Sequence, residues 1–197
     1  MRTTLIAAVT ALALCSMTTH ATDYDESTDG DLSGDRFNPT SLVFTEGVNT
    51  ITNTSILNDL DYLTVTVPVD TQLGAITLTG FESVDDLAFI AIQEGPTFTT
   101  SAEAPDITAL LGWAHIGPGA DGVPVGGDLL TALGTSPQAI GFTGPLDAGV
   151  YTFWIQQASG VSSTHTFEFV VTSTIPVPGA LALCAAAGIR TRRRRTH

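Results

Sequence analysis

The sequence contains no lysine, and its seven basic side chains are all arginines, against 20 acidic residues. Six arginines lie near the two ends of the chain, so Arg36 is the only basic residue between Asp23 and Glu168. All the acidic residues lie in this middle segment, where one positive and 20 negative charges give a formal charge of −19. Nucleic-acid-binding proteins neutralise phosphates with a basic patch, so we expect no nucleic-acid partner.

Cysteine is almost absent as well. Cys15 and Cys184 lie close to the two ends, and the middle of the chain contains no cysteine. A disulfide framework, a thiol nucleophile and a cysteine-type zinc site are therefore excluded from the middle. This middle segment is rich in Val, Ile, Leu and Phe, which argues against disorder. Its length of about 150 residues is enough for one domain that buries its own core.

The N-terminal segment has the three parts of a secretory signal peptide. Arg2 supplies a positive charge, residues 5–15 are mostly apolar, and Thr19 and Ala21 are small residues at the −3 and −1 positions of a cleavage site. We therefore predict a signal helix in residues 1–21, which signal peptidase removes after Ala21. The alternative is a buried N-terminal strand or helix.

The C-terminal residues 174–197 contain two prolines, a short apolar run and a group of arginines. The apolar run at 177–189 would form a short helix of roughly 20 Å, against a bilayer core of about 30 Å. The basic cluster behind it would stay on the cytoplasmic side of a membrane. The prolines and clustered arginines of this segment are Pro176, Pro178, Arg192, Arg193, Arg194 and Arg195.

This order of features resembles the PEP-CTERM family of bacterial C-terminal sorting signals. Val177 stands where that family has an acidic residue between the two prolines. The resemblance implies that an exosortase-like enzyme removes the tail during export to the cell surface, after a transient stage of membrane anchoring. A permanent C-terminal membrane anchor is the alternative.

Between the two ends, apolar and polar residues alternate with a period of two, which predicts short strands. Residues 87–92 are apolar throughout, as expected of a strand that is buried on both faces. Clusters of Gly, Pro, Asp and Asn, such as those at 68–70 and 147–149, predict turns between strands. One helix is expected, at 129–133 after a cap at Asp128. The predicted strands are residues 41–44, 49–52, 62–67, 73–79, 87–92, 150–155 and 165–171.

This spacing predicts an all-β fold, namely an antiparallel β-sandwich over residues 41–173 after an acidic lead-in segment at 22–40. Residues 59–62 have the pattern Asp-x-Asp-Tyr, and residues 149–153 have the pattern Gly-x-Tyr-x-Phe. Together with residues 23–33 and 166–170, they resemble the bacterial pre-peptidase C-terminal family. The resemblance implies a small, jelly-roll-like sandwich that accompanies secreted or surface proteins and is not itself catalytic.

Acidic residues near the predicted turns suggest a calcium site. Residues 25–31 mimic the first seven positions of an EF-hand loop, but the twelfth position, which requires a bidentate Glu, is Arg36. A true EF-hand is therefore excluded, whereas a looser site would draw carboxylates from loops at one end of the sandwich. The alternative is a solvated acidic surface without a metal. No cofactor is required, and the candidate calcium ligands are Asp29, Asp31, Asp59, Asp61, Asp85 and Asp86.

The residues needed for catalysis do not form a recognisable set, and we predict that the protein is not an enzyme. His115 and His165 are the only histidines of the middle segment, and neither has a nucleophile elbow or a metal-ligand spacing around it. Adjacent carboxylates such as those at 85–86 point to opposite faces of a strand. Residues 117–122 match a dinucleotide-binding pattern in letters, but no βαβ unit surrounds them, so we expect a loop.

Trp113 and His115 form a candidate ligand-binding pair beside this glycine-rich loop. Trp113, together with Tyr62, Tyr151 and Trp154, would provide a sugar-stacking platform. The competing interpretation places these aromatic side chains in the core, because alternating strands direct half of such a set inward.

Taken together, these features predict an exported bacterial cell-surface or extracellular-matrix protein of structural or adhesive type, in contact with extracellular polysaccharide. A calcium-assisted carbohydrate-binding module is the first alternative, and a secreted hydrolase is the second.

Overall fold

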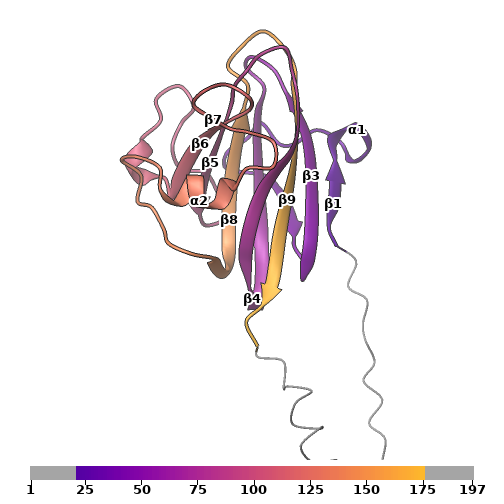
Figure 1. Cartoon of the computed structure of the whole chain (residues 1–197), viewed down its shortest axis with the longest axis vertical. Helices are drawn as coiled ribbons and strands as arrows, with labels where there is room; N and C mark the ends of the chain where they lie inside the picture. Colours follow the sequence, from indigo (N-terminus) through magenta and orange to yellow (C-terminus); the bar gives the residue numbers. More distant parts are fainter. Residues whose placement is uncertain (1–20, 176–197) are drawn as a thin grey trace, which may run out of the picture.

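The computed structural model describes residues 21–175, and these form an all-β fold, as the sequence predicts (Figure 1). The predicted signal peptide and sorting signal lie outside the described residues, apart from Ala21, Thr174 and Ile175. Within the described part, no helix is both long enough and apolar enough to span a membrane. In chain order the elements are β1 (Asp23–Asp25), α1 (Glu26–Asp29), β2 (Thr40–Val43), β3 (Gly47–Ser55), β4 (Leu60–Glu82), β5 (Ala88–Glu94), the 3₁₀ helix η1 (Ile107–Ala109), β6 (Gly112–Ile116), β7 (Gly122–Val123), α2 (Leu129–Gly134), β8 (Leu146–Gln156) and β9 (Ser163–Ser173).

The strands of residues 21–175 form a mixed sheet in the order β1-β3-β9-β4-β8-β5-β6-β7, and β2 pairs with β4 beside this path. The pairings of β1 with β3, β2 with β4 and β6 with β7 are parallel, so the prediction of an entirely antiparallel sheet is wrong. Each parallel pair includes a strand of two to four residues. The alternation of side chains predicts which face a residue occupies but not the direction in which such a short strand runs.

β4 is 23 residues long and contains both the predicted strands at 62–67 and 73–79 and the predicted turn between them. Its register with β8 shifts between Val67 and Gln72, and Asp70 has a φ of 63°. Proline is tolerated within a sheet where the ladder is interrupted by a bulge. The turn residues therefore mark an irregularity within β4, beyond which β4 pairs with β9. The predicted turn at 147–149 likewise lies inside β8.

The main hydrophobic core contains side chains from β3, β4, β5, β8 and β9. Leu63, Val65 and Val67 all point into it, as their spacing predicts. Aromatic rings fill its centre, where Phe153 on β8 lies 5.5 Å from Phe169 on β9 between ring centroids. Burial of such large apolar surfaces is the dominant favourable contribution to folding.

A second, smaller cluster lies on the opposite face of β4, β8 and β5. Tyr62 and Trp154 are almost fully buried there, under Phe98 and Leu110 from the segment between β5 and β6. The core interpretation is therefore correct for Tyr62 and Trp154, and also for Tyr151, which is 7% exposed in the main core.

The structure confirms the predicted helix, contains short strands that were not predicted, and buries His165. The predicted helix at 129–133 is confirmed as α2, whose N-cap Asp128 accepts a hydrogen bond from the backbone N of Thr131 at 3.0 Å. The short strands β1, β6 and β7 were not predicted, because none of them carries more than a few alternating residues. His165 is buried on the same face of β9 as Phe167, as its strand position predicts.

Candidate functional site

The chain between β1 and β2 carries two acidic side chains to the start of β4. Asp25 accepts a hydrogen bond from the backbone N of Ser27 at 2.9 Å and thereby caps α1, a single helical turn at the β1 edge of the domain (Figure 1). Gly30 ends this turn with a φ of 102°, a conformation that favours glycine. The local sequence therefore reverses the chain and places Glu26 and Asp31 next to Asp61.

Glu26, Asp31 and Asp61 each place a carboxylate oxygen within 4.8 Å of the other two, and we call this group the acidic triad. Asp31 is exposed, Glu26 is half-buried and Asp61 has no exposed surface. The structure thus brings together two of the predicted calcium ligands. The third member, Glu26, was not among the residues predicted from the sequence.

Backbone hydrogen bonds hold Glu26 in the triad. Its Oε1 accepts from the backbone N of Leu32 at 3.0 Å, and its Oε2 accepts from the backbone N of Thr54 at 2.5 Å. Burial raises the pKa of Glu26 although these hydrogen bonds oppose the shift. Glu26 thereby joins the lead-in segment to β3 with both carboxylate oxygens.

Asp61 is the buried member of the triad, and only one of its oxygens is paired. Its Oδ2 accepts a hydrogen bond from Asn53 Nδ2 at 2.8 Å, whereas Asp61 Oδ1 and Asn53 Oδ1 have no hydrogen-bond partner among residues 21–175. Burial and then the neighbouring charge of Glu26 raise the pKa of Asp61 to about 8. Burying an unpaired polar atom is costly, and a cation bound by the carboxylate of Asp61 would lower that cost.

The other predicted calcium ligands are not members of the triad. Asp59 lies near enough to contribute to the raised pKa of Asp61, but it is not part of the group. Asp29 accepts a hydrogen bond from the backbone N of Asp25 at 2.9 Å.

Asp85 and Asp86 lie in the loop after β4, separate from the triad. The side chain of Asp85 is hydrogen-bonded to Ser159 in the loop between β8 and β9. That loop also contacts the chain before β4, because Ser159 O accepts from the backbone N of Leu57 at 2.9 Å. The loops do lie together, as predicted, but the carboxylates at 85–86 do not reach the triad.

The predicted ligand-binding pair lies at a different place, on the face of the sheet that carries the smaller cluster. The rings of Trp113 and His115 on β6 are 5.7 Å apart, and Phe89 on β5 stacks on Trp113 at 6.3 Å. Together with Trp154 and Gln156 on β8 they line a groove of about 490 Å³, which we call the aromatic groove.

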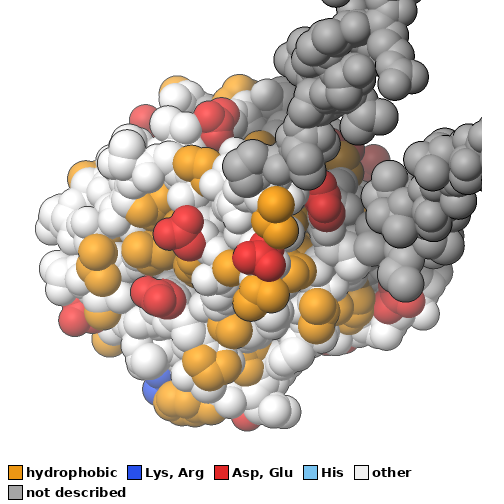
Figure 2. Space-filling view, turned by 90° about the horizontal axis from the view of Figure 1, so that it is seen from below, with side chains coloured by type: hydrophobic (Ala, Val, Ile, Leu, Met, Phe, Trp, Pro, Cys, Tyr) orange, Lys and Arg blue, Asp and Glu red, His pale blue; other side chains and the backbone are white. Residues whose placement is uncertain are grey.

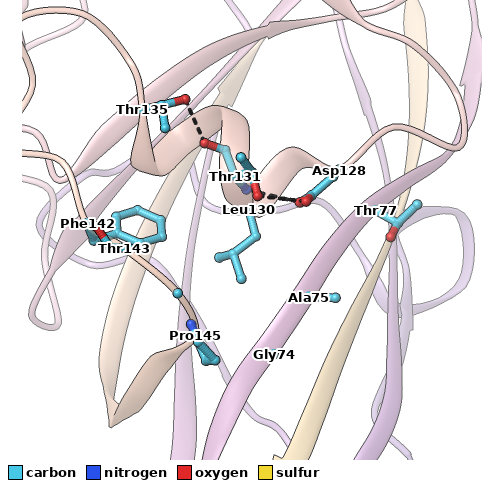
Figure 3. Close-up of a pocket in the computed structure, with 11 residues that line it drawn as sticks. Gly74, Ala75, Thr77, Asp128, Leu130, Thr131, Thr135, Phe142, Thr143 and Pro145 are labelled. Carbon is cyan, nitrogen blue, oxygen red and sulfur yellow. Dashed lines mark hydrogen bonds between the residues drawn. The ribbon is translucent and has the colours of Figure 1, made fainter.

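A second cavity, of about 520 Å³, lies between β4 and α2 (Figure 3). Leu130 projects into it, and Phe142 lines one side. Three of its polar groups serve the helix itself: Thr131 Oγ1 donates to Asp128 Oδ2 at 2.7 Å, and Thr135 Oγ1 donates to the carbonyl oxygen of Thr131 at 2.9 Å. The hydroxyl groups of Thr77 and Thr143 also line the cavity.

Ser163 and His165 form a pair that resembles part of a catalytic dyad. Ser163 Oγ lies 2.8 Å from His165 Nε2. Both residues have no exposed surface, however, and burial lowers the pKa of His165 to about 4. A substrate cannot reach them without unfolding this end of the core.

The acidic side chains outside the triad are spread over the surface. Figure 2 shows them separated by hydrophobic and uncharged groups on the face seen from below. Exposed hydrophobic residues include Val69 at the irregularity of β4 and Val84 in the loop after it, which is ordinary for a protein surface.

Comparison with known proteins gives no match: no protein-family model, no curated protein and no solved structure is significantly similar to this chain. The resemblances of its short motifs to known families therefore stay predictions.

Proposed function

We propose that the chain is an exported bacterial surface or extracellular-matrix protein of structural or adhesive type, whose β-domain is stabilised by calcium. The observation that carries this proposal is the buried carboxylate of Asp61, which has an unpaired oxygen beside Glu26 and Asp31. The proposal includes no catalytic activity.

The donor atoms favour calcium over other metals. Every group in the triad offers oxygen, and Asn53 Oδ1 is a further unpaired oxygen next to Asp61. Zinc prefers nitrogen and sulfur ligands, and magnesium requires a compact octahedron, whereas calcium accepts six to eight oxygens in irregular arrangements. Water would complete the coordination on the exposed side, at Asp31.

A calcium ion held by these residues would link three parts of the chain. Glu26 and Asp31 belong to the lead-in segment, Asn53 lies on β3 and Asp61 lies on β4. Extracellular calcium sites are weak, with Kd values of ~10⁻⁴–10⁻³ M, and fill only where calcium is abundant. A site of this kind suits a protein that completes its folding outside the cell.

The sequence of the two ends supports export. We propose that signal peptidase cleaves after Ala21 and that an exosortase-like enzyme recognises the tail with Pro176 and Pro178. The chain enters β1 and leaves β9 on the lower side of the domain in Figure 1, so the processed ends would leave the upper side free.

We also propose that the domain is a jelly-roll-like β-sandwich of the pre-peptidase C-terminal type. The exchange of partners along β4, from β2 and β8 to β9, supports two layers, and side chains from both sets of strands share the main core. Figure 1 is consistent with this arrangement.

Thermal unfolding with and without calcium tests the site. With Kd values of ~10⁻⁴–10⁻³ M, about 10 mM calcium adds about 1.4–2.7 kcal/mol to the free energy of unfolding. For a domain of this size the midpoint rises by about 3–10 °C. Asp61→Asn should remove the shift, because an amide supplies no charge. The matched control Asp86→Asn, an exposed residue outside the triad, should retain it.

Equal calcium shifts in the wild type and in D61N would refute the site, as would no shift at all in the wild type. Export has a separate test, which is mass spectrometry of the protein collected from the cell surface. We expect a chain that begins at Thr22 and lacks the arginines at 192–195. An intact chain that remains inside the cell would contradict the proposal.

A further inference from the structure

The aromatic groove is formed by side chains that face the same way from three neighbouring strands. Phe89 on β5 pairs with Gln156 on β8 and with His115 on β6. One step along the strands, Ala91 pairs with Trp154 and with Trp113. The segment between β5 and β6 closes the groove on another side with three apolar residues, Ala102, Pro105 and Ile107.

The rings of the groove are held in place. Trp113 Nε1 donates a hydrogen bond to the carbonyl oxygen of Pro137 at 3.1 Å. Phe89 lies nearly parallel to Trp113, at an interplanar angle of 21°, and meets Trp154 edge-on at 4.8 Å between ring centroids. A fixed, flat aromatic surface is thus present before any ligand binds, which lowers the entropic cost of binding.

Polar groups in the groove are left without partners. Trp154 is only 2% exposed, yet its indole Nε1 has no hydrogen-bond acceptor among residues 21–175. The side chains of His115 and Gln156, both half-buried, form no hydrogen bond within the described chain either. The indole Nε1 of Trp154 has almost no accessible surface, so the polar groups that a ligand in the groove would meet are His115 and Gln156.

The charges of the groove and of the domain limit the chemical class of ligand that can bind. Among residues 21–175, no Asp, Glu, Lys or Arg lines the groove. An anionic ligand would meet no counter-charge there and would approach a domain with a large negative charge, whereas a cation would find no carboxylate. A purely apolar ligand would cover the polar side chains of His115 and Gln156 without giving them a hydrogen-bond partner. The remaining class is an uncharged ring with one apolar face and hydroxyl groups at its edge.

We propose that the aromatic groove binds a sugar ring of an uncharged polysaccharide. The apolar face of the ring stacks on Trp113 and Phe89, and hydroxyl groups at its edge form hydrogen bonds with His115 and Gln156. Pockets of a few hundred Å³ with apolar walls and few polar groups are typical of such binding sites. This inference rests on the proposed adhesive role and gives it a ligand class, but it does not require the calcium site.

Tryptophan fluorescence offers a direct assay, because the chain contains two tryptophans and both line the groove. The full chain is titrated with uncharged hexasaccharides of glucose, xylose and mannose, with the free monosaccharides, and with an anionic uronic-acid hexasaccharide. We expect saturable fluorescence changes with at least one uncharged hexasaccharide, weaker binding of its monosaccharide and none of the anionic one. Calorimetry on the same samples checks that the signal reports binding.

Variants separate binding by the groove from binding elsewhere. Trp113→Ala should reduce affinity, measured by calorimetry, at least about tenfold. Gln156→Ala should weaken binding about two- to tenfold and removes no hydrogen bond of the folded chain. The control Phe37→Ala changes a residue that is 60% exposed and lies outside the groove, so affinity should be unchanged.

The proposal is overturned if no uncharged oligosaccharide binds at about 10 mM, a concentration above the Kd of weak ligands. It is also overturned if the uronic-acid ligand binds as well as the uncharged ones, if W113A binds like the wild type, or if the fluorescence change follows protein concentration, which would indicate a second copy in the groove. Binding that persists in a chelator while export fails would contradict the proposed function and leave the groove's ligand class standing.

Discussion

His165 and Asp61 lie at the same end of the core and should shift the stability of the protein in opposite directions as the pH changes. Asn53 connects them, since it pairs with His165 across β3 and β9 and donates to Asp61. Burial lowers the pKa of His165 to about 4 and raises that of Asp61 to about 8. Replacing either residue should expose the pH dependence due to the other.

The signs follow from which state binds more protons. The unfolded chain binds protons more readily at His165, so the stabilisation from the neutral ring is present above about pH 6.5 and is lost as the pH falls towards 4. The folded chain binds a proton more readily at Asp61, so the stabilisation from the neutral carboxyl is present below about pH 4 and is lost as the pH rises towards 8. For each of the two groups, the free energy of unfolding changes by at most about 1.4 kcal/mol per pH unit.

Between about pH 4.5 and 6.5 these two slopes cancel in the wild type. As the pH rises through this range, the free energy of unfolding of Asp61→Asn should therefore increase by about 2–3 kcal/mol relative to the wild type. That of His165→Gln should decrease by about as much. The assay is urea denaturation in a chelator at several pH values. The remaining carboxylates contribute equally to all three proteins and drop out of the differences.

Parallel curves of unfolding free energy against pH for the wild type, D61N and H165Q would refute this reasoning. Such a result would mean that neither group keeps its perturbed pKa when the protein is folded in solution. Curves that diverge with the opposite signs would refute it as well.

Two further substitutions test the packing that positions β6 and α2. Gly112→Ala would push a methyl group into the backbone of Leu133, and we expect a loss of about 1–3 kcal/mol in unfolding free energy, measured by urea denaturation. Asp128→Ala removes the cap that binds Thr131 at the start of α2, and it should cost about 1 kcal/mol, measured as a lower thermal midpoint by circular dichroism.

Most strands could be predicted from the sequence because alternation is a local property. Leu63, Val65 and Val67 point to one face in any register, and their spacing alone reveals it. The pairing of the strands into a sheet could not be predicted in this way. Residues 68–70 carry turn signals and the pairing is interrupted there, yet β4 does not end, because its pairing resumes with β9 at Thr71 and with β8 at Gln72.

The acidic triad could be predicted only in part. Asp31 and Asp61 were named as candidates, but Glu26 did not fit the alternate spacing of a calcium loop, and Asn53 was not considered as a ligand. One signal was available: Asp61 is in phase with Leu63 and Val65, so its burial follows from the same alternation. Its meeting with Glu26 depends on how distant segments pack, which no local pattern contains.

The aromatic groove, like the acidic triad, could be predicted only in part. Trp113 and His115 are two residues apart on one strand, so their shared face was predictable. The contributions of Phe89, Trp154 and Gln156 depend on the registers of β5 with β6 and β8.

The most direct test of the calcium-stabilised domain is a crystal structure of the protein grown with calcium, with anomalous scattering recorded from the metal. We expect an anomalous peak between Glu26, Asp31 and Asp61, with Asp61 Oδ1 at about 2.3–2.6 Å from it. A structure in about 10 mM calcium, above the Kd of weak extracellular sites, that shows no peak there and Asp61 Oδ1 paired to a protein group would contradict the account.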